Sequence, residues 1–532
     1  MPTRDDGCCS RRFLYDGAVI DAGGRLDDRG HSFARAWVFR STALAAVGVV
    51  LAVAAFQLWI TPSNPPGFLP DEASMSYNAY LLSHHLHDEN GGLLPLYLRS
   101  FGDYKSPMFT YTLAAVFRVV GPHSEAARAL AAAGILAAVL LLGLLARRRT
   151  RSNVVAVAVV VLAGLTPYLF EVGRAAYEVA LEPAVICLLL LAVEASWRAR
   201  SWTVGRALLV GLALAGVAYV YAAGRLLAPL FALALLVFAG KGRWRWLSVA
   251  WGTFAVTAVV PIGVYWLRHP GALTTRYEQT TFIDSSMAPW TIVRRVASNY
   301  VHDLNLWHWI TAGDPKPYVH TWNAGSIFAS VVVLAATGAV IVLVRERGNL
   351  FWRYALALFV LAPIPAAVTN DRFYGLRLVP LPVLLIVLSI PALALLRRAA
   401  NTRWAARALA AGLAAAVAVQ FVDFLVNYRI RGPQRKVVFH SGVPTLLAEG
   451  FQGGRTIYID YDEPHALVYA RWYAVEHGIS LSRVIRLSDG GIPPTGAVVF
   501  GRFQGCDFIC RRTATFDDYW IADALGPRPA GS

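Results

Sequence analysis

The chain has 532 residues, of which 56% are hydrophobic and only 15% are charged, and its mean hydropathy is +0.48. This composition excludes an ordinary soluble globular protein and indicates a membrane protein. The net charge of +16 would suggest nucleic-acid binding in a soluble chain, but the basic residues lie in short clusters between apolar runs. No basic stripe interleaved with aromatic residues is present, so we expect no nucleic-acid partner and interpret the clusters as topology signals.

The N-terminal segment, residues 1–35, is mixed in charge and rich in glycine, so it is predicted to be a disordered cytoplasmic tail. Residues 36–60 are apolar and long enough to cross a bilayer. This run is too long, and the segment before it too extended, for a typical cleaved signal peptide. We therefore interpret it as a membrane anchor.

The apolar runs that follow predict a multi-pass protein with about 11 membrane spans in all. The run 107–120 is too short to cross and is predicted to lie along the outer surface, because counting it as a span would place the cluster Arg147, Arg148 and Arg149 outside. With this choice every basic cluster faces the cytoplasm. The other predicted spans are 125–146, 154–170, 179–197, 207–221, 226–239, 246–267, 327–344, 354–368, 378–396 and 404–426.

Residues 427–532 are more polar and are predicted to form a small α/β domain outside the cytoplasm. Strand patterns occur at 456–460, 484–487 and 497–501, and an amphipathic helix at 464–477. Cys506 and Cys510 could form a disulfide in an oxidising compartment. The predicted fold class is therefore an all-α polytopic membrane domain over residues 36–426, with surface helices in its first outside loop, followed by this extracytoplasmic α/β domain.

The first candidate site is the acidic pair Asp71–Glu72, just past the outer end of the first span. A helix is predicted to begin at Pro70 and to run to about His87. Two carboxylates at a membrane surface, with Lys105 in the same loop, can remove a proton from a hydroxyl and hold a phosphate. This combination indicates group transfer from a lipid-borne donor. The alternative is that both acids only cap the helix, where the helix dipole favours them.

Other ionisable residues lie at the outer edges of the predicted spans, where their cost favours a functional role. Glu178 and Glu182 are four residues apart on one helix face, and the alternative for them is interfacial snorkelling or capping. His84, His87 and Asp88 would share a helix face and could hold a divalent ion, although a solvated helix end is the simpler interpretation.

The motifs in these loops resemble the GT-C membrane glycosyltransferases, in the bacterial branch related to protein O-mannosyltransferases and the lipid A aminoarabinose transferase. The resemblance rests on the order and spacing of six segments. These are Pro70-Asp71-Glu72, Tyr104-Lys105-Ser106-Pro107, Ala127-Arg128-Ala129-Leu130, Gly173-Arg174-Ala175-Ala176-Tyr177-Glu178, Gly313-Asp314-Pro315-Lys316-Pro317 and Leu376-Arg377-Leu378-Val379-Pro380.

The resemblance implies transfer of a sugar, with inversion, from a polyprenyl-phosphate donor to a hydroxyl of an envelope lipid, glycan or protein at the outer face of the plasma (inner) membrane. It implies Asp71 as general base. A helix N-terminus lowers the pKa of an aspartate and weakens it as a base, and like-charge repulsion from Glu72, the second candidate catalytic residue, offsets this effect. Lys105 would bind the donor phosphate together with an arginine, since the guanidinium fork suits phosphate. The candidate arginines are Arg128, Arg225 and Arg377, and the candidate substrate-binding residues are Tyr104, Arg174, Tyr177, Glu178 and Asp314.

Two departures from the family pattern leave the sugar and a divalent metal open. Tyr104 stands where an acid commonly precedes the lysine, and Ser106 where a proline often follows it. Two other classes of membrane protein fit this pattern less well. A transporter or flippase would carry its charges at mid-membrane on broken helices, and a non-catalytic envelope scaffold would leave the clustering of acid, lysine and arginine unexplained.

Overall fold

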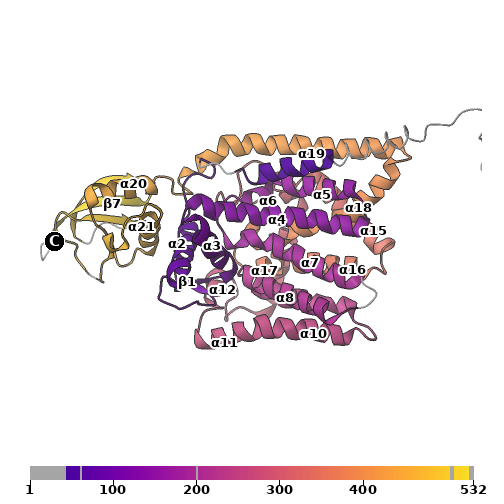
Figure 1. Cartoon of the computed structure of the whole chain (residues 1–532), viewed down its shortest axis with the longest axis horizontal. Helices are drawn as coiled ribbons and strands as arrows, with labels where there is room; N and C mark the ends of the chain where they lie inside the picture. The colour runs from indigo at the N-terminus through magenta and orange to yellow at the C-terminus, as the bar shows by residue number, and fades with distance from the viewer. Residues whose placement is uncertain (1–43, 60–62, 199–201, 490, 504–507, 527–532) are drawn as a thin grey trace, which may run out of the picture. The chain divides into compact units, whose positions relative to one another are not determined.

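The computed structural model describes residues 44–59, 63–198, 202–489, 491–503 and 508–526 (Figure 1). The tail predicted at 1–35 lies outside these residues. The described chain is mostly helical and carries a small sheet near its C-terminus. This agrees with the predicted combination of a helical membrane domain and a C-terminal α/β segment.

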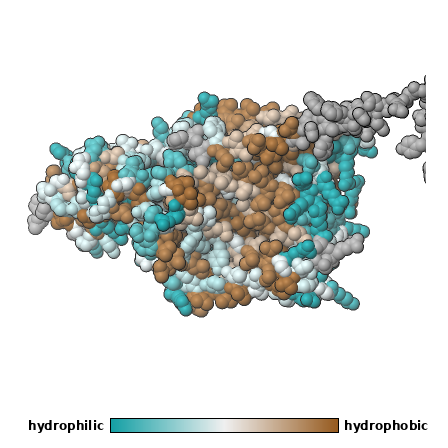
Figure 2. Space-filling model, viewed as in Figure 1, coloured by the Kyte–Doolittle hydropathy of each residue, from teal (hydrophilic) through white to brown (hydrophobic). Residues whose placement is uncertain are grey.

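Six described helices are long and apolar enough to cross a membrane. They are α4 (Ser124–Thr150), the continuous helix Glu178–Arg198 that contains α7 (Glu182–Arg198), Trp244–Arg268 with α10 (Trp244–Phe254) and α11 (Val260–Arg268), Leu350–Ala367 with α16 (Leu350–Leu361) and α17 (Ile364–Ala367), α18 (Pro380–Ala400), and Trp404–Lys436 with α19 (Trp404–Arg431). Figure 2 shows a brown hydrophobic band over this helical part, bordered by teal hydrophilic zones on both sides. The chain is therefore built as a multi-pass membrane protein.

Shorter apolar helices complete the helical part. They are Leu44–Gln57, α3 (Pro107–Val120), α5 (Asn153–Leu165), α8 (Val204–Val220), Gly224–Phe238 with α9 (Gly224–Ala234), and α15 (Ala329–Val344). Each predicted span overlaps one of the long or short apolar helices, and α3 coincides with the predicted surface helix. The number of spans and their orientation stay predictions.

Close packing of the helices depends on small residues at specific contacts. Gly338 of α15 faces α18, where an added Cβ would lie 1.8 Å from the backbone oxygen of Leu388. Small residues let two helix backbones approach closely in a membrane, where packing rather than the hydrophobic effect drives association. At the turn before α5, the side chain of Ser152 accepts a hydrogen bond from Val155 N and caps the helix.

The segment after the first helix supplies part of the candidate site. α2 (Pro70–His85) packs on α3 and α21, and the hairpin of β1 (Leu98–Ser100) and β2 (Asp103–Lys105) follows it. α2 ends at His85 because Leu86 takes the left-handed αL conformation at the C-cap. The helix is thus shorter than predicted, and His87 lies beyond its end.

The C-terminal sheet has the strand order β4-β3-β5-β7-β6, parallel between β3 and its neighbours β4 and β5 and antiparallel between β5, β7 and β6. The predicted strands correspond to β3 (Ile457–Ile459), β4 (Val484–Arg486) and β5 (Val498–Arg502), and the predicted helix to α21 (Pro464–Glu476). The remaining elements, β6 (Ile509–Phe516), β7 (Tyr519–Gly526) and α20 (Val443–Phe451), were not predicted. Cys510 is disulfide-bonded, and Cys506 lies outside the described residues.

The strands β6 and β7 escape a pattern-based prediction for a physical reason. β7 lies between β5 and β6 and is buried on both faces over Tyr519–Ala522, so it shows no polar alternation. β6 is the edge strand and is largely exposed, and it carries Arg511 and Arg512, charges that are typical of protected sheet edges.

Contacts of α21 join the C-terminal part to the site. The hydroxyl of Tyr469 donates a hydrogen bond to the backbone oxygen of Phe68 at 2.5 Å, and Trp472 Nε1 lies 3.1 Å from Ser124 Oγ at the start of α4. The rings of Phe68 and Trp472 are stacked. The backbone that leads into α2 is therefore held from the C-terminal side.

Further helical segments of 3 to 15 residues connect these elements. They are α6 (Pro167–Val172), α12 (Thr275–Thr280), α13 (Pro289–Asp303), α14 (Leu306–Thr311) and the 3₁₀ turn η4 (Gly375–Arg377). Two of them, α12 and η4, supply arginines to the site.

Candidate active site

Two adjoining cavities lie at the ends of the apolar helices. The first, which we call the arginine cavity, has a volume of about 380 Å³ and the second, the Asp71 cavity, about 250 Å³. Lys105, Glu178, Tyr221 and Arg276 line both. The arginine cavity adds Asp103, Arg225, Thr369 and Arg377 among others, and the Asp71 cavity adds Asp71, Tyr177, Tyr318 and Tyr374.

The Asp71–Lys105 ion pair marks the junction of the two cavities. Lys105 Nζ lies 2.8 Å from Asp71 Oδ1, and the Asp71 side chain is 46% exposed. Asp71 sits in the first turn of α2, and Lys105 ends β2 opposite Leu98. Desolvation raises the pKa of the Asp71 carboxyl, but the charge and hydrogen bond of Lys105, with the charges of Arg276 and His465, outweigh it and hold this pKa below its usual value.

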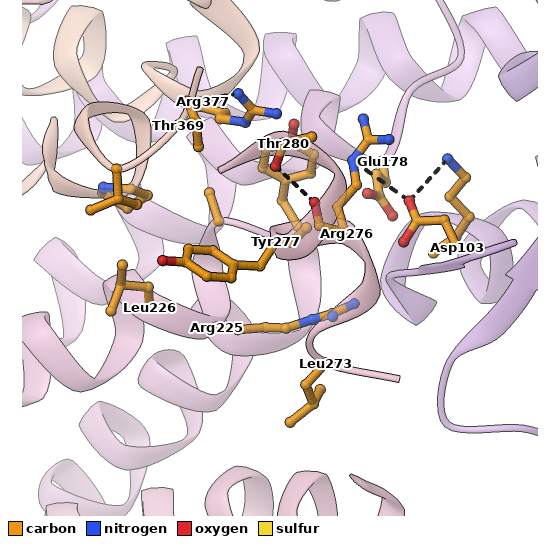
Figure 3. Close-up of a pocket in the computed structure, with 16 residues that line it drawn as sticks. Asp103, Glu178, Arg225, Leu226, Leu273, Arg276, Tyr277, Thr280, Thr369 and Arg377 are labelled. Atoms are coloured by element: carbon orange, nitrogen blue, oxygen red, sulfur yellow. Dashed lines mark hydrogen bonds and ion pairs between the residues drawn. The ribbon is translucent and has the colours of Figure 1, made fainter. Parts of the chain in front are cut away.

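Lys105 is surrounded by acids. Burial lowers its pKa, but Asp71, Asp103 and Glu178 raise it to about 12, so the ammonium group stays charged. Asp103 Oδ2 lies 3.8 Å from Lys105 Nζ and 3.6 Å from Arg276 Nε, and it thus bridges the two cations. Figure 3 shows this bridge at the edge of the arginine cavity.

Three arginines from separate segments converge on the arginine cavity (Figure 3). Arg225, at the start of α9, donates to the backbone oxygens of Tyr104 and Ala272 at 3.0 and 3.2 Å. Arg377, in η4, donates to Thr369 Oγ1 at 2.9 Å. Arg276 of α12 lines both cavities, and it was not among the predicted site residues. Such a convergence of guanidinium groups suits a phosphate.

The predicted residues Tyr104, Tyr177 and Glu178 lie close to these groups. Tyr104 gives its backbone oxygen to Arg225. Tyr177 lines the Asp71 cavity. Glu178 lines both cavities and accepts a hydrogen bond from Ser106 N at 2.5 Å, which fixes the residue next to Lys105.

Glu72 and Arg128 form a second ion pair that lines neither of these two cavities. Glu72 is fully buried, and its oxygens accept hydrogen bonds from Arg128, Leu69 N and Ala176 N. Arg128 also donates to the backbone oxygens of Pro65 and Gly67. Because every polar contact is directed at the protein itself, this geometry favours a structural role for both residues over the predicted catalytic and phosphate-binding ones.

Arg174 and Asp314 are likewise occupied by the backbone. Arg174 donates to the backbone oxygens of Phe170, Trp59 and Gln57. Asp314 accepts from Lys316 N at 2.7 Å and from Gly375 N, and burial raises its pKa to about 6. Neither lines the two cavities. Asp314 holds the backbone of Gly375, which stands between the lining residues Tyr374 and Arg377.

The structure does not bring together the candidate metal ligands His84, His87 and Asp88. His87 lies beyond the end of α2, Asp88 Oδ1 accepts hydrogen bonds from Asn90 N and Gly92 N, and His84 Nδ1 contacts Ser83 and Tyr80. The helical spacing on which the expectation rested is therefore wrong. Within the described residues, the one set of such side chains close enough for an ion is His440, Asp517 and Asp518, in the C-terminal part.

No protein-family model matches the chain, and no curated protein matches its sequence. The crystal structure of ArnT, the lipid A aminoarabinose transferase, from Cupriavidus metallidurans in the apo state overlaps 93% of this chain and 100% of its own, with a TM-score of 0.57 and 14% identity. The ArnT structure bound to undecaprenyl phosphate overlaps 92% and 99%, with a TM-score of 0.56 and 14% identity. The chain has the GT-C fold.

A more distant overlap involves the oligosaccharyltransferase AglB from Archaeoglobus fulgidus, with a TM-score of 0.48, 13% identity, and 82% of this chain and 64% of AglB covered. The overlap with ArnT confirms, for the fold, the GT-C resemblance inferred from the loop motifs. At 14% identity to ArnT the likeness establishes the fold alone, and the chemistry has to be argued from the residues of this chain.

Proposed function

We propose that this chain is a membrane glycosyltransferase that moves a sugar from a polyprenyl-phosphate donor to an acceptor hydroxyl, with Asp71 as general base. The observation that carries the proposal is the Asp71–Lys105 pair at the junction of two cavities, one of which gathers three arginines. The fold supports it, because the overlapping ArnT structure holds undecaprenyl phosphate.

The reaction divides between the two cavities. Asp71 takes the proton of the acceptor hydroxyl, the hydroxyl oxygen forms a bond to the anomeric carbon, and the bond from that carbon to the phosphate oxygen breaks with its electron pair on the phosphate. Lys105 and Arg276 stabilise the leaving phosphate, together with either Arg225 or Arg377. Attack opposite the leaving group inverts the anomeric centre.

Through this ion pair, the donor phosphate also changes the pKa of Asp71. In the free protein Lys105 lowers the pKa of Asp71 and so weakens it as a base. A donor phosphate that takes over part of the lysine's charge raises this pKa toward its ordinary value. Asp71 therefore becomes a better base when the donor is in place, and this favours transfer over premature reaction.

The arginine cavity also has an apolar side, formed by residues such as Leu226, Leu273, Pro365 and Val368. This side is suited to the first isoprene units of the carrier. Tyr177 and Glu178 line the Asp71 cavity, where the sugar and acceptor would meet, and we assign them to substrate binding. Tyr104 acts through its backbone oxygen on Arg225.

The lining residues come from helix ends and loops, for example Tyr221 after α8, Arg276 in α12 and Arg377 in η4. This placement supports a transferase at a membrane surface over a transporter, whose charges would lie at mid-membrane on broken helices. With the basic clusters in the cytoplasm, the site and the C-terminal domain face outward from the plasma (inner) membrane. The acceptor is then an envelope lipid, glycan or protein.

The decisive experiment is the Asp71→Asn variant. Asparagine keeps the size of the side chain, and Asp71 makes no cap hydrogen bond in α2, so the protein should fold and insert as before. It cannot take the acceptor's proton, and loss of a general base costs about 10²–10⁴-fold in rate. The measurement is transfer of labelled sugar from polyprenyl-phosphate donors to envelope extract by purified protein in nanodiscs. A folded Asp71→Asn protein that transfers sugar at the wild-type rate rejects the mechanism.

A further inference from the structure

Three side chains of the C-terminal part form a cluster that the proposed transferase chemistry does not use. His440 follows the long helix Trp404–Lys436, and Asp517 and Asp518 make the turn between β6 and β7. One ligand atom from each residue lies within 4.8 Å of the other two. Atoms that share a zinc ion at about 2.1 Å in a tetrahedron lie about 3.4 Å apart, and the exposed side chain of Asp517 can rotate to close the difference.

The hydrogen bonds of His440 leave its second ring nitrogen available to a metal. Nδ1 lies 2.9 Å from the hydroxyl oxygen of Tyr469. That hydroxyl donates its only proton to the backbone oxygen of Phe68 at 2.5 Å, so toward His440 it acts as the acceptor of Nδ1–H. The neutral imidazole therefore carries its lone pair on Nε2. A histidine whose other ring N–H is held by a hydrogen bond is the usual arrangement of a metal ligand.

Asp518 contributes a buried carboxylate oxygen that has no partner. Its Oδ2 accepts a hydrogen bond from Arg502 Nε at 2.8 Å, whereas its Oδ1 is buried and accepts none. A buried acceptor left unsatisfied is costly, and a bound ion is one physical explanation for it. The bond from Arg502 orients the carboxylate, as hydrogen bonds from outer-shell groups do for ligating acids. Asp517 makes no side-chain hydrogen bond or ion pair within the described residues, so both its oxygens are available.

The ligand atoms and their charges select the metal. Two carboxylates against the single guanidinium of Arg502 leave a net negative charge, which favours a cation. An imidazole nitrogen with two carboxylate oxygens suits Zn²⁺, whereas Mg²⁺ and Ca²⁺ prefer shells made of oxygen alone. Three protein ligands leave one tetrahedral position for water.

We propose that His440, Asp517 and Asp518 bind a Zn²⁺ ion that joins the β6–β7 turn to the segment after α19. From His440 the contacts continue through Tyr469 to the backbone of Phe68, which leads into α2. The ion stabilises the C-terminal sheet in its contact with this segment, because the free energy of metal binding adds to the stability of the folded protein. The inference goes beyond the transferase function and does not rest on it.

The test uses the full chain without an affinity tag, in nanodiscs, depleted of metal with a chelator and then titrated with Zn²⁺. At zinc concentrations that saturate the site, wild type should bind one zinc ion more per chain than Asp517→Asn, and zinc should raise its thermal unfolding midpoint. Loss of an outer-shell partner typically weakens metal binding about 10–100-fold. Tyr469→Phe should fall in that range, and Asp517→Asn, which removes a ligand, should lose at least about 100-fold.

The matched control is Asp462→Asn, which removes an exposed acid of the same part outside the cluster and should bind zinc as wild type does. Comparison with Asp517→Asn also subtracts zinc held by exposed histidines such as His84 and His85. If Tyr469→Phe fails to fold, Asp517→Asn still decides, because its side chain makes no structural contact.

Equal zinc content and equal stabilisation in wild type and Asp517→Asn overturn the proposal, as does stabilisation by Mg²⁺ that matches that by Zn²⁺. Asp71→Asn should bind zinc like wild type, since Asp71 is not a ligand. The result is therefore separate from that of the transfer assay: an active Asp71→Asn enzyme would reject the general base and leave the zinc site intact.

Discussion

Asp71 and Glu72 are neighbours in the sequence and each pairs with a cation, yet the two pairs differ in exposure and in what surrounds them. Asp71 is 46% exposed and pairs with Lys105 at the junction of two cavities. Glu72 is 0% exposed and pairs with Arg128 between α2 and α4. Consecutive helical residues do not face the same way, so one carboxylate is directed to the cavities and the other into the protein. An ion pair with an accessible edge can exchange its partner for a substrate, whereas a fully satisfied one holds the backbone.

The largest expected effect comes from breaking the buried Glu72–Arg128 pair. Glu72→Gln leaves the Arg128 guanidinium buried without its counter-charge, and losing one partner of a buried pair costs about 3–5 kcal/mol. We expect a large loss of stability, measured as the midpoint of thermal or denaturant unfolding in nanodiscs. Asp71→Asn is the matched control and should unfold close to wild type.

A double variant separates pairing from packing. In Glu72→Gln with Arg128→Met, the unpaired buried charge is gone, so part of the lost stability should return. If Glu72→Gln unfolds like wild type but loses sugar transfer, the assignment is reversed and Glu72 belongs to the chemistry.

Breaking the accessible Asp71–Lys105 pair should lower the activity and leave folding unchanged. Lys105→Ala removes a cation that we assign to the donor phosphate, which at low donor concentration costs about 2–5 kcal/mol in kcat/KM. Lys105→Arg should recover part of the loss, because the charge is restored in a different geometry. The measurement is kcat/KM for the donor in folded protein, and a wild-type value for Lys105→Ala would remove the lysine from the phosphate site.

The fold and the accessible pair could be predicted because they depend on local signals. Apolar runs with basic ends locate the helices. Asp71 directly follows Pro70, which begins α2, and Lys105 stands two residues before Pro107, which begins α3. The burial of Glu72 could not be read from sequence, since it depends on Arg128, 56 residues away. Arg276 was missed because no motif surrounds it, and only the placement of α12 beside β2 brings it to Asp103.

The smallest effect concerns the pH dependence set by the charges around Asp71. Lys105, Arg276 and His465 lower its pKa against the opposing desolvation, and Asp103 and Glu178 face Lys105. An Asp with a depressed folded pKa gives stability that is present above its unfolded pKa and lost as pH falls through the folded value. The same depression keeps Asp71 ionised, and ready to act as base, well into the acid range.

Arg276→Gln removes the second of these cations while leaving the Asp71–Lys105 contact in place. The pKa of Asp71 should rise, so the acidic limb of kcat/KM should move to higher pH, by less than in Lys105→Ala because Lys105 lies closer and donates a hydrogen bond. Profiles from about pH 3 to pH 7, each normalised to its own plateau, measure the shift independently of any loss in donor binding. Arg372→Gln, outside both cavities, is the control and should leave the limb unchanged. A limb that stays fixed in both Arg276→Gln and Lys105→Ala belongs to a group other than Asp71, and the exposed pair would then be no more catalytic than the buried one.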